Sequence, residues 1–183
     1  MKFAILCAAA GLALLPLPAR AAADLVFLVR HAERAAEPAG DPGLTSAGAA
    51  RAQALAQALA DAGLKQIITT QFRRSQETAA PLAQQLQLPP QVLAARRGEA
   101  EAHLREIREA VLHQDGGALL IVGHSNTVPA IIAALGGPRL PDLCESSYQH
   151  LFVLRLPVQP GVPASLARLR YGEPSPAAEA ACL

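Results

Sequence analysis

Aromatic side chains are scarce in this sequence of 183 residues: they make up 3% of it, and tryptophan is absent. The core must therefore be built from leucine, isoleucine, valine and alanine. Net charge is also nearly lacking, since 16 lysines and arginines stand against 15 acidic residues. This balance excludes a general electrostatic attraction to nucleic acid or to an anionic membrane surface. Any site for an anion must be local.

Cysteine is rare as well, with three residues, Cys7, Cys144 and Cys182. Their spacing contains no metal-binding motif. In an oxidising compartment Cys144 and Cys182 could form a disulfide that ties down the C-terminus. The alternative is two free thiols.

The N-terminus has a long apolar run, from Phe3 to Leu17. Lys2 precedes this run and the small-residue stretch "PARAAA" follows it, which is the layout of a secretory signal peptide. The run is shorter than the ~20 residues of a membrane-spanning helix. We therefore expect a signal peptide over residues 1–21 of a bacterial protein that is exported, to the periplasm or outside the cell, without stable membrane insertion.

The remaining residues, 22–183, have the length of one domain. Apolar segments rich in β-branched residues alternate with segments of helical periodicity, a pattern typical of α/β domains. The expected strands cover residues 25–30, 66–70, 89–93, 118–124, 150–156 and 165–171, and the expected helices cover 46–62, 73–86, 99–112 and 125–135. We predict one three-layer α/β domain, with a mostly parallel open sheet and helices on both faces.

Three local features are also expected. Thr45 should cap the first helix, because its side chain can accept a hydrogen bond from the first turn. Pro81 should kink or shorten the second helix. The tail beyond Gly172 should be loose.

Basic side chains follow three of the expected strands. Arg30 and His31 end the first strand, Arg73 and Arg74 follow the second, and His124 precedes a helix whose N-terminal amides favour an anion. Ligands of open α/β sheets bind at the carboxyl ends of the strands. Guanidinium groups match phosphate oxygens, and a neutral imidazole can attack phosphorus. The sequence therefore predicts a pocket for a phosphoryl group.

Five blocks of the sequence resemble the histidine phosphatase superfamily, also called phosphoglycerate mutase-like, in its small secreted branch. "LVRHAER" is similar to the signature at the end of the first strand, and "DPGLTSAGAARAQALAQAL" to the Leu-Thr-x-x-Gly start of the next helix. "TTQFRRSQETAAPLA" resembles the Arg-Ala-x-Gln-Thr-Ala segment, "IVGHSNTVPAIIAALGG" the second histidine block, and "CESSYQHLFVL" the segment before the late strand. The resemblance covers nearly all of residues 22–183.

The resemblance implies a phosphomonoester hydrolase that needs no metal or other cofactor. His31 would be the histidine that becomes phosphorylated. Arg30, Arg74 and a protonated His124 would hold the phosphoryl oxygens. For Arg73 we expect either a solvated side chain or a positive charge behind the residues that touch the phosphoryl group. The implied partner is a small phosphorylated substrate or a phosphoprotein, and not a nucleic acid.

The acid that protonates the leaving group has no recognisable motif in this sequence. Glu99 and Glu101 lie in the loop where relatives often carry it, and Glu145 is a third candidate. Other relatives have an aspartate after the second histidine, where this chain has Ser125. Alternatively, Glu99 and Glu101 only stabilise the first turn of a helix.

Four more residues are candidate substrate contacts. Arg34 could reach a second anionic part of the substrate, and Glu33 could orient Arg30 or Arg34, although a solvated surface pair is the alternative for both. Ser125 and Asn126 follow the second histidine.

Two other function classes stay open. A phosphatase-like fold without a working acid would bind phosphate with little turnover. A serine esterase is suggested by "GHSNT", which approximates the Gly-x-Ser-x-Gly elbow with Ser125 as nucleophile. Thr127 occupies the last glycine position of that motif, however, and only His150 follows as a triad histidine.

Two further points concern the histidines. A metal site on His31 and His124 is disfavoured, because two adjacent arginines would repel a cation. We expect His103, His113 and His150 to be hydrogen-bonded structural residues or exposed ones.

Overall fold

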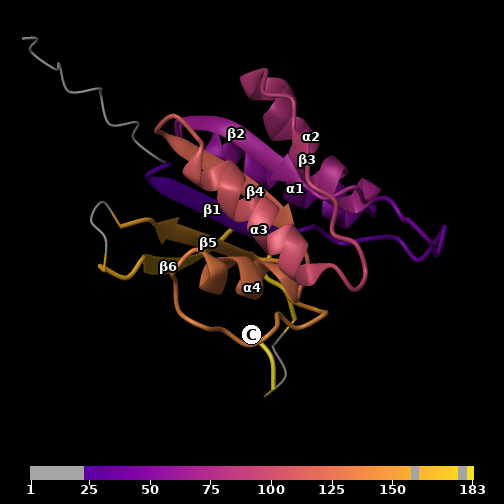
Figure 1. Cartoon of the computed structure of the whole chain (residues 1–183). Coiled ribbons are helices and arrows are strands. Elements are labelled where there is room, and N and C mark those ends of the chain that lie inside the picture. Colours follow the sequence, from indigo (N-terminus) through magenta and orange to yellow (C-terminus); the bar gives the residue numbers. More distant parts are fainter. Residues whose placement is uncertain (1–22, 158–160, 177–180) are drawn as a thin grey trace, which may run out of the picture.

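The strands and helices alternate along the chain as the sequence predicts. The computed structural model describes residues 23–157, 161–176 and 181–183 (Figure 1). Its strands are β1 (Leu25–Arg30), β2 (Leu64–Thr69), β3 (Gln91–Val92), β4 (Ala118–Gly123), β5 (His150–Arg155) and β6 (Ser165–Arg170). Its helices are α1 (Ser46–Leu59), α2 (Arg73–Leu86), α3 (Ala100–Leu112) and α4 (Thr127–Ala134).

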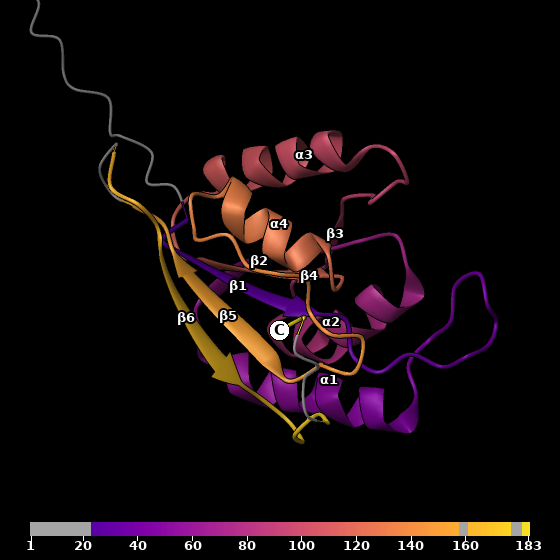
Figure 2. The same ribbon diagram turned by 90° about the horizontal axis from the view of Figure 1, so that it is seen from below.

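The six strands form one sheet in the order β3-β2-β4-β1-β5-β6. Strands β1, β2, β3 and β4 are parallel, whereas β5 is antiparallel to β1 and β6 is antiparallel to β5. Helices α3 and α4 cover one face of the sheet, and α1 and α2 cover the other (Figure 2). The predicted three-layer α/β domain with a mostly parallel sheet is confirmed, and the carboxyl ends of β1, β2 and β4 meet at one edge.

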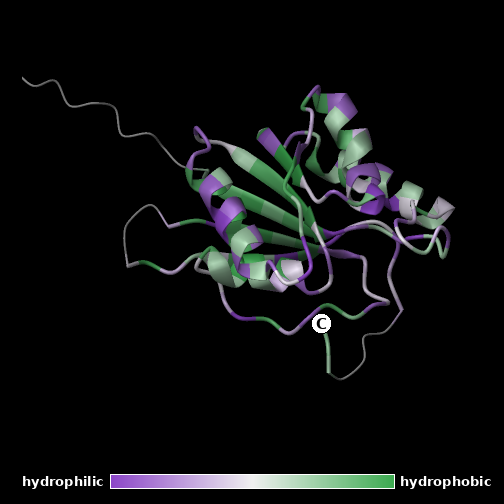
Figure 3. Ribbon diagram, turned by 45° about the vertical axis from the view of Figure 1, so that its right-hand side comes forward, coloured by the Kyte–Doolittle hydropathy of each residue, from purple (hydrophilic) through white to green (hydrophobic). Residues whose placement is uncertain are grey.

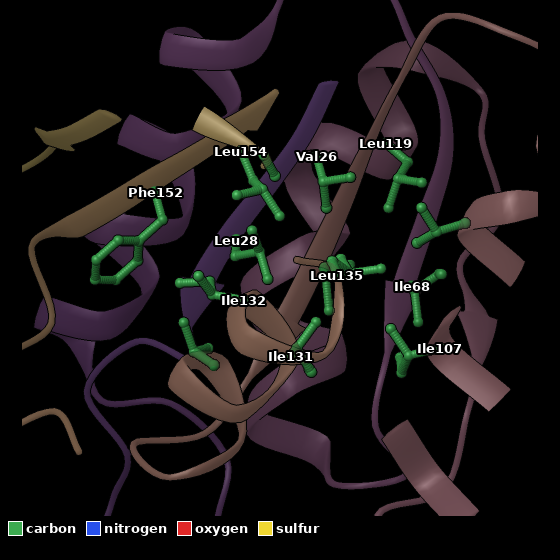
Figure 4. Close-up of a cluster of buried hydrophobic side chains, with 14 of the residues drawn as sticks. Val26, Leu28, Ile68, Ile107, Leu119, Ile131, Ile132, Leu135, Phe152 and Leu154 are labelled. Carbon is green, nitrogen blue, oxygen red and sulfur yellow. The ribbon is translucent and has the colours of Figure 1, made fainter. Parts of the chain in front are cut away.

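Each face of the sheet has its own apolar core, because successive side chains of a strand point to opposite faces. Val26 and Leu28 of β1 lie in the cluster that includes Ile107 of α3 and Ile131 of α4 (Figure 4). The cluster on the other face includes Phe27, Val29, Leu55, Leu59, Leu82 and Leu120. Hydrophobic residues accordingly dominate the central strands (Figure 3).

Helix α1 begins as predicted and ends early. The side chain of Thr45 accepts a hydrogen bond of 3.1 Å from the backbone nitrogen of Gly48, which confirms the predicted cap. The helix ends at Leu59, before the expected end at residue 62. Gly63, at a φ of +66°, then turns the chain into β2.

Pro81 lies inside α2, and the helix continues from Arg73 to Leu86 around it. Pro81 therefore does not shorten this helix, which has the expected bounds 73–86, and the kink that was the alternative stays a prediction. Ala79 and Leu82 on either side of the proline are fully buried. Their packing offsets the backbone hydrogen bond that proline cannot donate.

The tail beyond Gly172 is anchored wherever the structure describes it, so the expectation of a loose tail is wrong. The backbone nitrogen of Tyr148 donates to the hydroxyl of Ser175 at 2.9 Å. Cys182 is joined to Cys144 in a disulfide. The disulfide is one of the two alternatives that the sequence left open for these cysteines, whereas the Ser175 bond leaves no hydrophobic periodicity from which it could be predicted.

Residues 1–21, where we expect the signal peptide, lie outside the described residues, and export stays a prediction. Within the described ranges, no helix has both the length and the hydropathy required to cross a bilayer.

Candidate active site

A pocket of about 670 Å³ opens at the edge of the sheet where β1, β2 and β4 end. Its ionisable and polar lining residues include Arg30, His31, Arg34, Arg74, Arg96, Arg97, His103, His124, Ser125, Asn126 and Glu145. The structure thus brings together the four residues that the sequence predicts for a phosphoryl pocket. Arg34, Ser125 and Asn126 also reach this pocket.

The guanidinium of Arg30 is buried and held by one loop. Its Nη1 donates to the backbone carbonyls of Cys144 at 2.7 Å, Glu145 at 2.9 Å and Ser147 at 3.3 Å. Its Nη2 donates to the carboxylate of Glu145 at 2.6 Å. The Cζ atom also lies 4.3 Å from the centre of the Tyr148 ring, in cation–π contact. These contacts fix the position of Arg30.

His31 follows β1 directly and is buried. Its Nδ1 lies 2.8 Å from the carbonyl oxygen of Ala32. A carbonyl only accepts, so Nδ1 carries the proton and Nε2 keeps a lone pair. Burial above all, together with the positive charges of Arg30 and Arg74, lowers the pKa of His31 to about 3, although the Ala32 carbonyl opposes this. His31 is therefore a neutral imidazole with a free Nε2.

His124 is the second histidine of the pocket, and its ring centre lies 5.3 Å from that of His31. Its Nε2 lies 3.0 Å from the hydroxyl oxygen of Thr70, which itself donates to Ser75. Burial first, then nearby His31 and Arg74, lowers the pKa of His124 to about 3. In the free pocket His124 is thus neutral, and the protonated form expected around a bound phosphoryl group stays a prediction.

The close approach of α4 to β4 positions His124. The backbone nitrogen of His124 donates to the hydroxyl of Thr127 at 2.8 Å, which fixes the first turn of the helix. A Cβ on the preceding Gly123 would lie 2.8 Å from that same hydroxyl oxygen. The missing side chain at Gly123 therefore allows the strand to pass directly into the histidine.

Arg74 reaches the pocket from the first turn of α2. Its Cζ lies 4.2 Å from the centre of the Phe72 ring, and its Nη1 lies 4.0 Å from Asp41. The hydroxyl of Thr78 donates to the Arg74 carbonyl and accepts from the backbone nitrogen of Ala32. Thr78 thus links the helix that carries Arg74 to the chain just after His31. The neighbouring arginine at position 73 is exposed and does not line the pocket.

The carboxylate that lines the pocket belongs to Glu145. It accepts hydrogen bonds from Nη2 of Arg30 at 2.6 Å and from the hydroxyl of Ser125 at 2.7 Å. Burial alone would raise the pKa of Glu145, but the Ser125 hydrogen bond and the Arg30 charge outweigh it and lower the pKa. Glu145 is therefore ionised in the free pocket.

The structure does not bring the other two candidate acids to the pocket. Neither Glu99 nor Glu101 lines it, and both are exposed. Glu99 instead pairs with Arg96 at 3.3 Å. Helix α3 starts at Ala100, and both Ala100 and His103, one turn further on, line the pocket.

Glu33 has a different role from the one expected. Instead of orienting Arg30 or Arg34, its carboxylate accepts three hydrogen bonds of 2.7–3.0 Å from Arg51 of α1. The expectation for Glu33 is therefore wrong. Arg51 lies on the buried face of α1 one turn before Leu55, which indicates a buried arginine but does not identify Glu33 as its partner.

The sequence analysis did not place three aromatic or imidazole side chains in the site. Tyr148 stacks on Arg30, and the ring of Phe72 lies edge-on to that of His124. His103 lines the pocket although a purely structural role was expected. Its spacing of four residues from Ile107 places it on the buried stripe of α3, which was the available signal.

The serine esterase arrangement does not form. The hydroxyl of Ser125 donates to Glu145, and the ring of His124 bonds to Thr70. His150 lies in β5 and does not line the pocket. No hydrogen bond joins Ser125 to a histidine in the part of the chain that the structure describes.

Among the described residues, five arginines and a single carboxylate line the pocket, so its charge suits an anion. Among the described residues, Nε of Arg30 and Nε of Arg74 are buried without a hydrogen-bond partner. Unpaired buried donors on cations fit an anionic ligand. Across residues 23–157, 161–176 and 181–183, no three histidine, cysteine, aspartate or glutamate side chains are grouped to hold a metal ion.

Comparison with solved structures shows the same fold in several phosphatases. The protein histidine phosphatase SixA, bound to tungstate, has 16% sequence identity and a TM-score of 0.59, over 80% of this chain and 96% of SixA. A mycobacterial glucosyl-3-phosphoglycerate phosphatase, bound to inorganic phosphate, has 16% identity and a TM-score of 0.63, over 79% and 95% of the two chains. No curated protein matches the sequence.

Comparison with protein families gives a match over residues 26–97 to the histidine phosphatase superfamily (branch 1). The matched segment contains β1 with Arg30 and His31, and α2 with Arg74. The fold of the whole described chain agrees with this match. Residues 26–97 are thus similar to the histidine phosphatase superfamily (branch 1), and the described chain shares the fold of the solved phosphatases.

Proposed function

We propose that the protein is a metal-independent phosphomonoester hydrolase that acts through a phosphohistidine on His31. The observation that carries this proposal is the state of His31: a buried, neutral imidazole whose proton is held on Nδ1, beside Arg30 and Arg74. A neutral imidazole is a competent nucleophile. The match of residues 26–97 to the histidine phosphatase superfamily supports the same reaction.

In the first step, Nε2 of His31 attacks phosphorus, the N–P bond forms and the bond from phosphorus to the leaving oxygen breaks. Arg30 and Arg74 bind the equatorial oxygens, where negative charge spreads in the transition state. Thr70 donates to Ser75, so the one N–H of neutral His124 is on Nε2 and is donated to Thr70. A second N–H for the phosphoryl oxygens requires protonation of the His124 ring. A bound phosphate dianion would also raise the pKa of His124.

The leaving oxygen needs a proton, and we assign this step to Glu145. Arg30 and Ser125 keep its carboxylate ionised in the free pocket. A phosphoryl group that takes over Arg30 removes one of these causes and adds negative charge nearby, so the pKa of Glu145 rises and the carboxyl can hold a proton. In the second step water attacks phosphorus, the N–P bond breaks, and Glu145 regains its proton from that water.

The first experiment measures phosphate release from p-nitrophenyl phosphate by residues 22–183 in the presence of EDTA. We expect release that survives the chelator and disappears in His31→Ala, with a phosphorylated His31 detectable by intact mass after rapid quenching. If phosphate binds tightly but no ester in a broad panel is hydrolysed, the protein is a binding module instead.

A second experiment tests Glu145 separately from His31. Glu145→Gln should reduce kcat/KM about 100-fold for alkyl phosphates, which need a proton on the leaving oxygen. For p-nitrophenyl phosphate, whose leaving group departs as an anion, the reduction should be under about tenfold. Equal reductions for both leaving groups would contradict the assigned proton transfer.

We also propose that the protein acts outside the cytoplasm on small phosphorylated molecules. The signal layout of residues 1–21 supports export. Fusion of residues 1–21 to a reporter that is active only after export would test this directly, and retention of the reporter in the cytoplasm would oppose it.

A further inference from the structure

We propose that Asp41 is a positioning residue that holds Arg74 in the orientation required to bind the phosphoryl group. This inference rests on the proposed function, because it adds a residue to the same site. Asp41 is not among the described residues that line the pocket, so it would act on the phosphoryl group only through Arg74.

Helix α2, which carries Arg74 in its first turn, begins without a capping group of its own. The preceding residue, Phe72, has no side chain that bonds to the helix, and the first turn contains no acidic residue. The backbone N–H groups of a first helical turn need acceptors, and a carboxylate there also meets the positive end of the helix dipole. An acceptor from another segment would therefore stabilise the start of α2.

Asp41 supplies this acceptor from the loop between β1 and α1. Its Oδ1 accepts a hydrogen bond of 2.9 Å from the backbone nitrogen of Arg73, the first residue of α2. The same oxygen lies 4.0 Å from Nη1 of Arg74. One carboxylate oxygen thus contacts both the start of the helix and the guanidinium that this helix presents to the pocket.

The state of the Arg74 side chain agrees with a positioned guanidinium. The side chain is 16% exposed, and its Nε is buried without a hydrogen-bond partner among the described residues. Burial first, and then the charge of Arg34, lowers the pKa of Arg74, while Asp41 is the largest opposing cause. Asp41 therefore stabilises the charged form of Arg74 and leaves Nε free for a phosphoryl oxygen.

A second carboxylate, that of Glu77, joins the same loop to the same helix. It accepts hydrogen bonds from the backbone nitrogen of Leu44 at 2.7 Å and from Nη2 of Arg73 at 3.0 Å. Glu77 is 37% exposed and Asp41 is 41% exposed. Among the described residues no ion pair joins Glu77 to Arg74. Glu77 is thus a matched control for the anchoring of the loop alone.

Two effects of the Asp41 carboxylate on phosphate binding differ in sign. Removal of a negative charge beside a pocket for an anion strengthens anion binding through the electric field. Release of the Arg74 guanidinium weakens it, because the match between guanidinium and phosphate oxygens depends on orientation. The direction in which the phosphate affinity changes therefore tests the inference.

The experiment measures the affinity for inorganic phosphate by calorimetry at one pH and one ionic strength. We expect the dissociation constant to rise about tenfold in Asp41→Ala. It should rise less in Asp41→Asn, which keeps an oxygen that can accept from the Arg73 nitrogen. Glu77→Ala should change it by less than about twofold. Unchanged or tighter binding in Asp41→Ala, or an equal loss in Glu77→Ala, would overturn the inference.

A double-mutant cycle shows whether Asp41 acts through Arg74. In Arg74→Ala, the further change Asp41→Ala should alter the phosphate dissociation constant by less than about twofold, because the guanidinium that it positions is absent. The value of kcat/KM for p-nitrophenyl phosphate should follow the same pattern. A tenfold loss that persists in the Arg74→Ala background would mean that Asp41 acts on another part of the protein.

The cycle also separates this inference from the proposed function, because phosphate binding requires no turnover. If no ester is hydrolysed but the phosphate affinities show the coupling, Asp41 positions Arg74 in a binding module. If His31-dependent hydrolysis proceeds and the affinities show no coupling, the role of Asp41 is refuted and the phosphatase proposal stands.

Discussion

Nη1 of Arg30 donates to the backbone carbonyl of Cys144 at a distance of 2.7 Å. Cys144 is also one end of the disulfide to Cys182. The bridge therefore fixes the loop whose carbonyl groups hold the buried guanidinium at the end of β1. A covalent bond near the C-terminus thus helps to position a residue that lies more than a hundred positions earlier in the chain.

Removal of this bridge should affect both stability and catalysis. Cys182→Ser should lower the free energy of unfolding by about 2–4 kcal/mol, the usual contribution of a disulfide that closes a loop of this length. It should also lower kcat/KM several-fold, because the acceptors of Arg30 become mobile. Urea unfolding and phosphate release measure the two effects. A reducing agent should reproduce both in the native protein and change nothing in Cys182→Ser.

The sequence predicted the layers of the fold well because its signals are periodic and local. The apolar run of β4 and the stripe of α3 each identify one element without knowledge of its neighbours. Pro81 and the tail beyond Gly172 were misjudged for the opposite reason. In both cases contacts between distant segments, the burial of Leu82 and the bond from Tyr148 to Ser175, decide the outcome.

The candidate site was predictable as far as it follows the strand ends. Arg30 ends β1, and His31 and His124 directly follow β1 and β4, so a correct sheet brings the three together. The partners of acidic residues were not predictable in this way. Glu33 forms an ion pair with Arg51, and Glu145, which lies in the loop between α4 and β5, forms one with Arg30. No periodic pattern in the sequence indicates either pair.

The pair of Arg51 and Glu33 should be a large contributor to stability. Arg51 is 4% exposed and also donates to the backbone carbonyls of Tyr171 and Glu173. Arg51→Met should lower the free energy of unfolding by about 2–4 kcal/mol, since it leaves a carboxylate and two carbonyls without their donor. The control Arg73→Met removes an exposed ion pair and should cost under about 1 kcal/mol. Equal losses in urea unfolding would contradict the structural role of Arg51.

Acidification should destabilise the fold through its buried histidines. The pKa values of His31 and His124 are about 3 in the folded chain, whereas an unfolded histidine titrates near 6.5. Between these values the unfolded chain binds more protons, so the free energy of unfolding falls as the pH falls below about 6.5. Each histidine should account for about 1 kcal/mol between pH 7 and pH 5.5.

The comparison that isolates this effect is between the native protein and His31→Gln/His124→Gln. Urea unfolding at a series of pH values should give a flatter dependence for the double variant. Carboxylates such as Glu145 contribute equally to both proteins, so they cancel in the difference. Identical slopes would mean that neither histidine is held neutral by burial.

The hydroxyl of Thr70 should matter for catalysis more than for folding. It lies 3.0 Å from Nε2 of His124 and fixes the orientation of that ring. Thr70→Val keeps the shape of the side chain but removes the partner, so kcat should fall about tenfold or more, in the range seen for residues that orient a functional group. Ser75→Ala removes only the hydroxyl that accepts the hydrogen bond of Thr70, and it should have a smaller effect on kcat. The reverse order would show that Thr70 does not orient the histidine.

The close contact between Gly48 and Glu33 should make the addition of a methyl group at position 48 destabilising. A Cβ at position 48 would lie 2.3 Å from the backbone carbonyl oxygen of Glu33, and that oxygen also accepts from the backbone nitrogen of Thr45. Gly48→Ala should therefore lower the free energy of unfolding by about 1–3 kcal/mol despite the better helix propensity of alanine. It should also lower kcat/KM, because Glu33 lies two residues after His31.

Gly40→Ala is the matched control, since a Cβ at position 40 meets no atom within 4 Å and the backbone is not left-handed there. It should change the free energy of unfolding by under about 0.5 kcal/mol. Thermal and urea unfolding of the two variants, measured beside phosphate release, separate a steric cost from the general effect of replacing a glycine. If Gly48→Ala is as stable and as active as Gly40→Ala, α1 is free to move away from the segment after His31, and the site is less firmly held than the contact distance indicates.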